Sequence, residues 1–216
     1  MATTRGAVLW IVAAVGYLIL EAVAAAGFEP VYSYARNYIS DLGINAGEVV
    51  NGRMIDSPRS YLMHTAFCLQ GILFFSGALL IVGVPKSRRA RIFLGLVAAN
   101  AVGNIVIATL HSGNLHHVGA ALAIVGGNTA ILTGSAVVAT IVVERWYRRI
   151  SELVAALGLL SLLMLMINSA TSKHSVLPDG AWERGSVYSI ILWQLITAGC
   201  LLTIRRQRAT ARLDMD

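Results

Sequence analysis

The stretch "AVLWIVAAVGYLILEAVAAAGF" (residues 7–28) decides the fold class of this chain. Glu21 is its only charged side chain. A helix needs about 20 consecutive apolar residues to cross the roughly 30 Å hydrocarbon core of a bilayer. The stretch meets that length, and no small-x-small cleavage pattern follows it. We therefore predict a retained membrane-spanning helix rather than a cleaved signal peptide.

Stretches of the same kind recur along the rest of the chain. They cover residues 61–84, 92–110, 117–143, 151–170 and 187–204. The composition agrees, since 56% of the residues are hydrophobic and only 13% are charged, against about 25% charged in a soluble domain. Lipid offers no hydrogen-bond partner to open backbone groups, so spanning segments must be helical. We predict one all-α, polytopic membrane domain (residues 1–216), a bundle of six transmembrane helices.

Basic residues between the apolar stretches predict the orientation. They concentrate in "PKSRRARI" (85–92), "ERWYRRISE" (144–152) and "RRQRATAR" (205–212). By the positive-inside rule these segments, and with them both termini, are cytoplasmic. The 29–60 connection is then an outer loop of a multi-pass protein of the cell membrane. The net charge of +6 is mostly this topological charge, so we expect the lipid bilayer, not a nucleic acid, as the charged partner.

Ionisable and polar side chains gather at the predicted outer side. Charged groups inside a membrane are costly and usually face the protein interior. Glu21 lies in the outward third of the first span, and all five histidines fall near outer span ends. The outer set is Glu21, His64, His111, His116, His117, Asn168, Lys173, His174, Glu183, Arg184 and Tyr188. Two interpretations remain: residues tolerated at an interface, or an outward-facing polar pocket between the helix ends.

A second polar set lies deeper in the spans. Asn100 and Asn104 are four residues apart and share one helix face, while Gln70, Asn128 and Gln194 lie in other spans. Interhelical hydrogen bonds, worth about 0.6 kcal/mol each, are one explanation. The other is that these side chains form the floor of the same pocket.

The segment "YSYARNYISDLG" (32–43) follows the first span and is dense in hydrogen-bonding groups. Ser40 and Asp41 followed by Gly43 indicate a short helix or turn that stops at the glycine. Its tyrosines suit a membrane–water interface. We expect the segment to fold over the bundle and close its outer mouth, with a local ion pair between Arg36 and Asp41.

Four stretches together resemble a bacterial and archaeal family of small polytopic membrane proteins, catalogued only as a domain of unknown function. They are "YSYARNYISDLG" (32–43), "SPRSYLMHTAFCLQGILF" (57–74), "LHHVGAALAIVGGN" (115–128) and "WERGSVYSIILW" (182–193). The family's marks fall on Arg36, Asn37, Ser40, Asp41, Gly43, Ser57, Pro58, His116, Gly119, Glu183 and Arg184. The resemblance implies a six-helix membrane fold but brings no biochemical role with it.

Two functional hypotheses follow from these residues. The first is a pocket, capped by residues 32–43, that binds a lipid, an apolar small molecule or a membrane-protein partner. Its predicted ligand-binding residues are Arg36, Asn37, Ser40, Asp41, Asn104, His116 and Arg184. The second is an intramembrane enzyme that applies carboxylate and histidine acid–base chemistry to a lipid-like or isoprenoid substrate. Its catalytic candidates are Glu21, Asp41, His116 and Glu183.

Other classes of site are less well supported. "HSGNLHH" (111–117) could place His111, His116 and His117 around a metal with Asp41 or Glu183, but it lacks a recognised ligand pattern. No motif of a serine hydrolase, a zinc protease or a phosphate-binding loop is present, so we expect neither a metal nor a cofactor. A transporter is disfavoured because no inverted repeat with broken helices is visible.

Electrostatic cost predicts how the outer groups are arranged. Opposite charges brought together relieve part of the penalty of insertion near lipid. We therefore expect Asp41 or Glu183 to pair with Arg36 or Arg184 at the outer mouth, close to His116. Glu21, just below, is then the carboxyl group expected to face the pocket beside His116 without a cationic partner.

Overall fold

The computed structural model describes residues 1–213 except Asn51, 143–144 and 172–175. Within these residues the chain forms six α-helices, and each is long and apolar enough to span a membrane. They are α1 (Ala2–Ala25), α2 (Ser60–Val82), α3 (Arg88–Thr109), α4 (Gly113–Val138), α5 (Arg145–Thr171) and α6 (Asp179–Leu213). The prediction of a six-helix, multi-pass membrane protein is therefore confirmed.

The helix bounds differ from the apolar spans, most of all in α6. This helix begins at Asp179 rather than 187 and ends at Leu213 rather than 204. Its first two turns are polar because they pack against other protein segments instead of lipid. By contrast, α1 is shorter at its C-terminal end than its predicted span, since it ends at Ala25 rather than at residue 28. The fourth helix, α4, ends at Val138, short of the predicted end of that span at residue 143, which itself lies outside the described residues.

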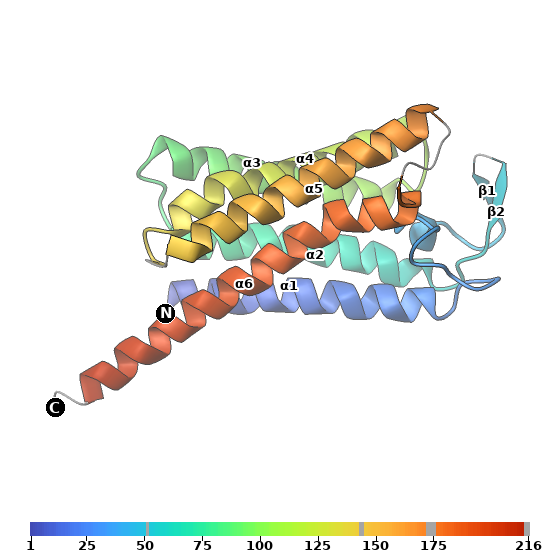
Figure 1. Ribbon diagram of the computed structural model, residues 1–216. Helices are drawn as coiled ribbons and strands as arrows, with labels where there is room; N and C mark the ends of the chain where they lie inside the picture. Colours follow the sequence, from blue (N-terminus) through green and yellow to red (C-terminus); the bar gives the residue numbers. More distant parts are fainter. Residues whose placement is uncertain (51, 143–144, 172–175, 214–216) are drawn as a thin grey trace.

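The helices pack in chain order, and α6 closes the bundle against α1 and also contacts α4. The start of α1 and the end of α6 lie at the same end, and α6 projects beyond the bundle there (Figure 1). We call this the terminal end, and the opposite one the capped end. The side of the membrane that each end faces remains a prediction from the basic residues.

Small residues allow the closest helix contact, between α3 and α4. A Cβ atom added at Gly103 would lie 2.4 Å from the backbone nitrogen of Ala123 and 2.5 Å from the carbonyl oxygen of Gly119. Helices in lipid associate through such packing because water is not there to drive them together. A side chain at Gly103 would push the two backbones apart.

An aromatic core fills the bundle. Trp193 of α6 packs against Trp10, with ring centroids 5.2 Å apart, and against Phe93 at 6.2 Å. Trp10 also donates a hydrogen bond from its indole nitrogen to the carbonyl oxygen of Phe74 over 2.9 Å. All four side chains are fully buried. This part of the bundle is therefore held together by aromatic packing rather than by ion pairs.

Residues 26–59, which we call the capping segment, cover the other end of the bundle (Figure 1). They contain the short 3₁₀ helix η1 (Ser40–Gly43) and an antiparallel hairpin of β1 (Glu48–Val50) and β2 (Arg53–Ile55). Ile39, Leu42 and Ile55 are buried against the helices. The capping segment is thus a packed part of the fold, as expected for residues 32–43.

Candidate functional site

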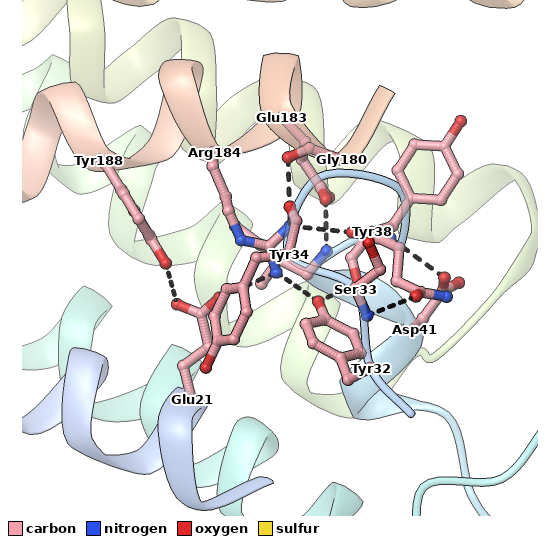
Figure 2. A network of polar contacts seen from close by, with 12 residues as sticks. Glu21, Tyr32, Ser33, Tyr34, Tyr38, Asp41, Gly180, Glu183, Arg184 and Tyr188 are labelled. Atoms are coloured by element: carbon pink, nitrogen blue, oxygen red, sulfur yellow. Dashed lines mark hydrogen bonds and ion pairs between the residues drawn. The ribbon is translucent and has the colours of Figure 1, made fainter. Parts of the chain in front are cut away.

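Arg184 of α6 and Glu21 of α1 form a buried ion pair at the capped end (Figure 2). The Arg184 Nη2 atom lies 3.1 Å from Glu21 Oε1, and the two residues are 6% and 1% exposed. The hydroxyl of Tyr188 donates to the second carboxylate oxygen over 2.8 Å. Both oxygens of Glu21 are therefore engaged, and its predicted role as the carboxyl group without a cationic partner is wrong.

The same guanidinium binds the backbone of the capping segment. Its Nη1 donates to the carbonyl oxygens of Tyr34 and Asn37 over 2.7 and 2.8 Å, and Nη2 donates to the hydroxyl of Tyr32. Its carbon centre lies 4.9 Å from the centroid of the Tyr34 ring. One side chain thus ties two helices and the capping segment together, an arrangement we call the Arg184 clasp.

Tyrosine hydroxyls extend the clasp along residues 32–38. Tyr32 donates to the carbonyl oxygen of Tyr38 over 2.7 Å, and Tyr38 donates to Asp179 Oδ2 over 2.7 Å. Burial raises the pKa of both phenols, and for Tyr38 the hydrogen bond to Asp179 raises it further. Both groups therefore stay protonated and act as donors across the neutral pH range.

Asp41 pairs with Arg53 of β2, not with Arg36. Two hydrogen bonds join the side chains, at 2.9 Å to Oδ1 and 3.2 Å to Oδ2, and the amide of Tyr38 also donates to Oδ2 over 3.1 Å. Arg36 is exposed. The predicted local ion pair is wrong because the hairpin carries Arg53 back over η1.

Asn37 and Ser57 hold the shape of the capping segment. The side-chain oxygen of Asn37 accepts from the amide of Ser33 over 2.9 Å, and the Ser57 hydroxyl donates to the carbonyl of Leu42 over 2.9 Å. Neither residue lines the cavity described below. In this structure, Asn37 and Ser57 act on the backbone of the cap.

A small, partly open cavity of about 50 Å³ lies beneath η1, among α1, α2, α3, α4 and α6. Its lining is mostly apolar, with a polar minority. The apolar residues are Ile39, Phe67, Ile107, Ala120, Ala123, Ile124, Val187 and Ile190, and the polar ones are Tyr17, Ser40, Gln70, Asn100, Asn104, His116 and Glu183. Of the deep polar residues predicted from the sequence, Gln70, Asn100 and Asn104 line the cavity. The other two, Asn128 and Gln194, form hydrogen bonds between helices.

Two buried polar atoms of this lining have no hydrogen-bond partner among the described residues: the Tyr17 hydroxyl and Gln70 Oε1. Tyr17 is 1% exposed and Gln70 is 4% exposed. The amide nitrogen of Gln70 donates to Gln194 Oε1 over 2.7 Å. Buried polar atoms are nearly always satisfied, so these two atoms are unusual among the lining residues.

Glu183 and His116 also line the cavity. Glu183 Oε2 accepts from the amide of Ile39, and in the described part of the chain no ion pair joins it to a basic side chain. His116 Nδ1 donates to the carbonyl of Leu110 over 2.7 Å, so in the neutral imidazole Nε2 is an acceptor. Glu183, not Glu21, is the carboxyl group that shares the cavity with His116.

The other histidines are arranged differently. His111 stacks on His64, with ring centroids 4.1 Å apart, and His64 Nε2 bonds the carbonyl of Gly43 over 2.6 Å. His117 is exposed beside His116. Among the residues the structure describes, no group of three or more His, Cys, Asp or Glu could hold a metal ion. Lys173 and His174 lie outside the described residues.

The sequence analysis did not predict Tyr17 and Arg53 as site residues, although a sequence pattern near each of them indicates its position. Tyr17 precedes Glu21 by one helical turn, so both project from one face of α1. Arg53 follows the dipeptide Asn51-Gly52, which is typical of a hairpin turn between two short strands.

The match to a family model covers most of the chain. The model of the family described as "Protein of unknown function (DUF998)" matches residues 11–199. The chain therefore belongs to this family, and the resemblance seen in its motifs is confirmed. Comparisons with curated proteins and with solved structures gave no match.

Proposed function

We propose that this DUF998 protein binds an apolar or amphiphilic molecule of the cell membrane in the cavity beneath the capping segment. The observation that carries the proposal is the pair of unpartnered polar atoms, Tyr17 hydroxyl and Gln70 Oε1, in a mostly apolar cavity. Ligand pockets typically combine an apolar lining with a few placed polar groups. The polar atoms would hold the head group of such a molecule, and the apolar lining would contact the part of its chain next to the head group.

The Arg184 clasp supports this assignment. Ile39 and Ser40 line the cavity from above, and their segment is fixed to α6 through carbonyl bonds at Tyr34 and Asn37. A fixed roof restricts where a head group can sit, and such preorganisation lowers the entropic cost of binding. Arg36, predicted to bind the ligand directly, is exposed, and Asn37 would act through the shape of the cap.

A second candidate function is acid–base catalysis on a lipid-like or isoprenoid substrate. The observation that favours it is that Glu183 and His116 line one cavity. A carboxyl group and an imidazole with an open Nε2 are the two kinds of group that most often transfer protons in enzymes. A binding protein returns its ligand unchanged, whereas this alternative would convert the ligand, so mass analysis of the recovered ligand separates the two.

The binding proposal is tested with a photoreactive hexadecanol and the full chain in phosphatidylcholine nanodiscs. Crosslinked peptides should come from α1, α2, α3, α4 and α6 around the cavity. One neutral hydrogen bond is worth about 0.5–1.5 kcal/mol, so Tyr17→Phe or Gln70→Met should weaken labelling roughly two- to tenfold. Tyr147→Phe is the matched control, because its buried hydroxyl bonds Thr197 instead.

The opposite pattern would overturn the proposal. Labels spread over lipid-facing positions such as Leu157 and Leu163, which are exposed on α5, with no effect of Tyr17→Phe, would mean that the probe marks only the bilayer boundary.

A further inference from the structure

We infer that the cavity selects an amphiphile with a protonated amine head group, that is, a long-chain primary ammonium. This inference rests on the proposed binding function and specifies its ligand. It follows from the polar atoms of the lining, which are rich in hydrogen-bond acceptors and include no basic side chain apart from a histidine.

Asn100 and Asn104 supply acceptors because their amide nitrogens are already used. Asn100 Nδ2 donates to the carbonyl of Ala123 over 2.6 Å, and Asn104 Nδ2 donates to the carbonyl of Asn100 over 2.9 Å. A backbone carbonyl can only accept, so these bonds fix which side-chain atom is nitrogen. Asn100 Oδ1 already accepts from Asn104 Nδ2 over 3.3 Å, so Asn104 Oδ1 is the acceptor that these bonds leave open.

Glu183, His116 and Gln70 add further acceptors. The Glu183 side chain carries two oxygens, and Oε2 accepts a backbone hydrogen bond from the amide of Ile39. His116 Nε2 accepts because Nδ1 holds the ring proton against the Leu110 carbonyl. Gln70 Oε1 is buried without a partner in the described chain. The hydroxyls of Tyr17 and Ser40 are donors in this lining, and a hydroxyl can also accept.

The charge of the lining points the same way. Its residues include no lysine or arginine, and Arg184 is committed to Glu21 and the capping backbone. A phosphate or carboxylate head group would therefore find no compensating cation in the lining, which is costly away from water. An ammonium has three N–H donors and no acceptor, so it matches both the charge and the hydrogen bonding of this lining.

The test compares ligands of one chain length: hexadecylamine, hexadecanol and hexadecanoic acid, bound to the full chain in phosphatidylcholine nanodiscs, with empty nanodiscs subtracted. Hydrogen bonds to charged groups are worth about 1.5–3 kcal/mol, so the amine should bind roughly ten- to a hundredfold tighter than the alcohol. Glu183→Gln keeps an oxygen for Ile39 and should bring the ratio close to one. Glu48→Gln, on the capping hairpin outside the cavity, should leave it unchanged.

The outcomes separate the inference from the function on which it rests. Equal binding of amine and alcohol, or tighter binding of the acid, overturns the amine inference and leaves ligand binding intact. Failure of every ligand to bind overturns both. If Glu183→Gln does not fold, the ratio on the unchanged protein still decides, and Asn104→Ser should lower amine binding roughly two- to tenfold.

Discussion

The two ends of the bundle treat charge in opposite ways. At the capped end, Glu21, Asp41 and Arg184 are 1%, 1% and 6% exposed, and each is held by several hydrogen bonds. At the terminal end the ion pair between Arg148 and Glu152 is 61% and 47% exposed. Exposed basic residues there can set the orientation of the chain while contributing little to its stability.

The contrast teaches where this protein depends on charge for its structure. A buried ion that loses its partner is strongly destabilising, whereas a solvated one is not. The interior between the ends uses aromatic packing around Trp193 instead. The capped end is thus the part of the molecule in which polar chemistry was retained despite its cost, and the candidate site lies there.

The largest expected effect is in cysteine labelling, which reports the side of the membrane that each end of the bundle faces. We introduce single cysteines at Ala46 in the capping segment and at Ser87 between α2 and α3, both of which are exposed, in a variant without Cys68 and Cys200. A membrane-impermeant thiol reagent on intact cells should label Ala46→Cys and spare Ser87→Cys until the cells are opened. The reverse pattern would turn the capped end toward the cytoplasm and exchange the roles assigned to the two ends.

The next effect is on the Arg184 clasp. Arg184→Gln leaves Glu21 buried without its cation and removes donors from the capping carbonyls, so we expect a loss of about 3–5 kcal/mol in the free energy of unfolding. Denaturant unfolding in detergent measures it. Adding Glu21→Gln should recover part of the loss, because the uncompensated charge is then gone; a double variant that is less stable still would show that the ion pair is not the source.

A smaller effect is expected at the ion pair inside the capping segment. Asp41→Asn weakens bonds from Arg53 and from the Tyr38 amide, and Arg53 is partly exposed, so we expect a loss of about 1–2 kcal/mol. The matched control is Glu48→Gln, which keeps an acceptor for its exposed hydrogen bond from Asn45. Equal and negligible losses for the two variants would contradict a structural role of Asp41.

The smallest effect belongs to the terminal end. Arg148→Gln breaks an exposed pair one turn apart on α5, which is worth about 0.5 kcal/mol or less. The same unfolding measurement in high salt should show almost no difference between this variant and the unchanged protein, since salt already screens the pair. A loss as large as that of Arg184→Gln would erase the contrast between the ends.

The spans could be predicted from sequence because lipid imposes a simple rule on length and hydropathy. The rule fails where helix surfaces meet protein instead of lipid. Residues 179–186 are too polar for a lipid-facing span, yet they continue α6 because Arg184 and Glu183 find partners in the capping segment. No window along a single chain segment contains that information.

The sequence predicted which charged residues belong to the candidate site better than it predicted which of them form ion pairs. The energetic cost of charge near lipid correctly predicted that the charged residues of the site lie at one end of the bundle; they are Glu21, Asp41, Glu183 and Arg184. The predicted ion-pair partner of Asp41 was Arg36, because the two are close in sequence, and this was wrong. The pairing depends on a hairpin that returns Arg53 to Asp41. It also depends on which helices are neighbours, since α1 meets α6 only when the bundle closes.

The Arg184 clasp also has a consequence for the order of events during synthesis. Tyr34 leaves the ribosome early, and Arg184 follows it by 150 residues. At about 5–20 residues per second this separation corresponds to roughly 8 to 30 s of translation. Throughout that interval Glu21 is already made but its cation is not, so the nascent chain must hold an unmatched carboxyl group at the membrane. The capping segment can therefore reach its final structure only after the last helix is made. A chain released before residue 184 would keep Glu21 without its ion-pair partner.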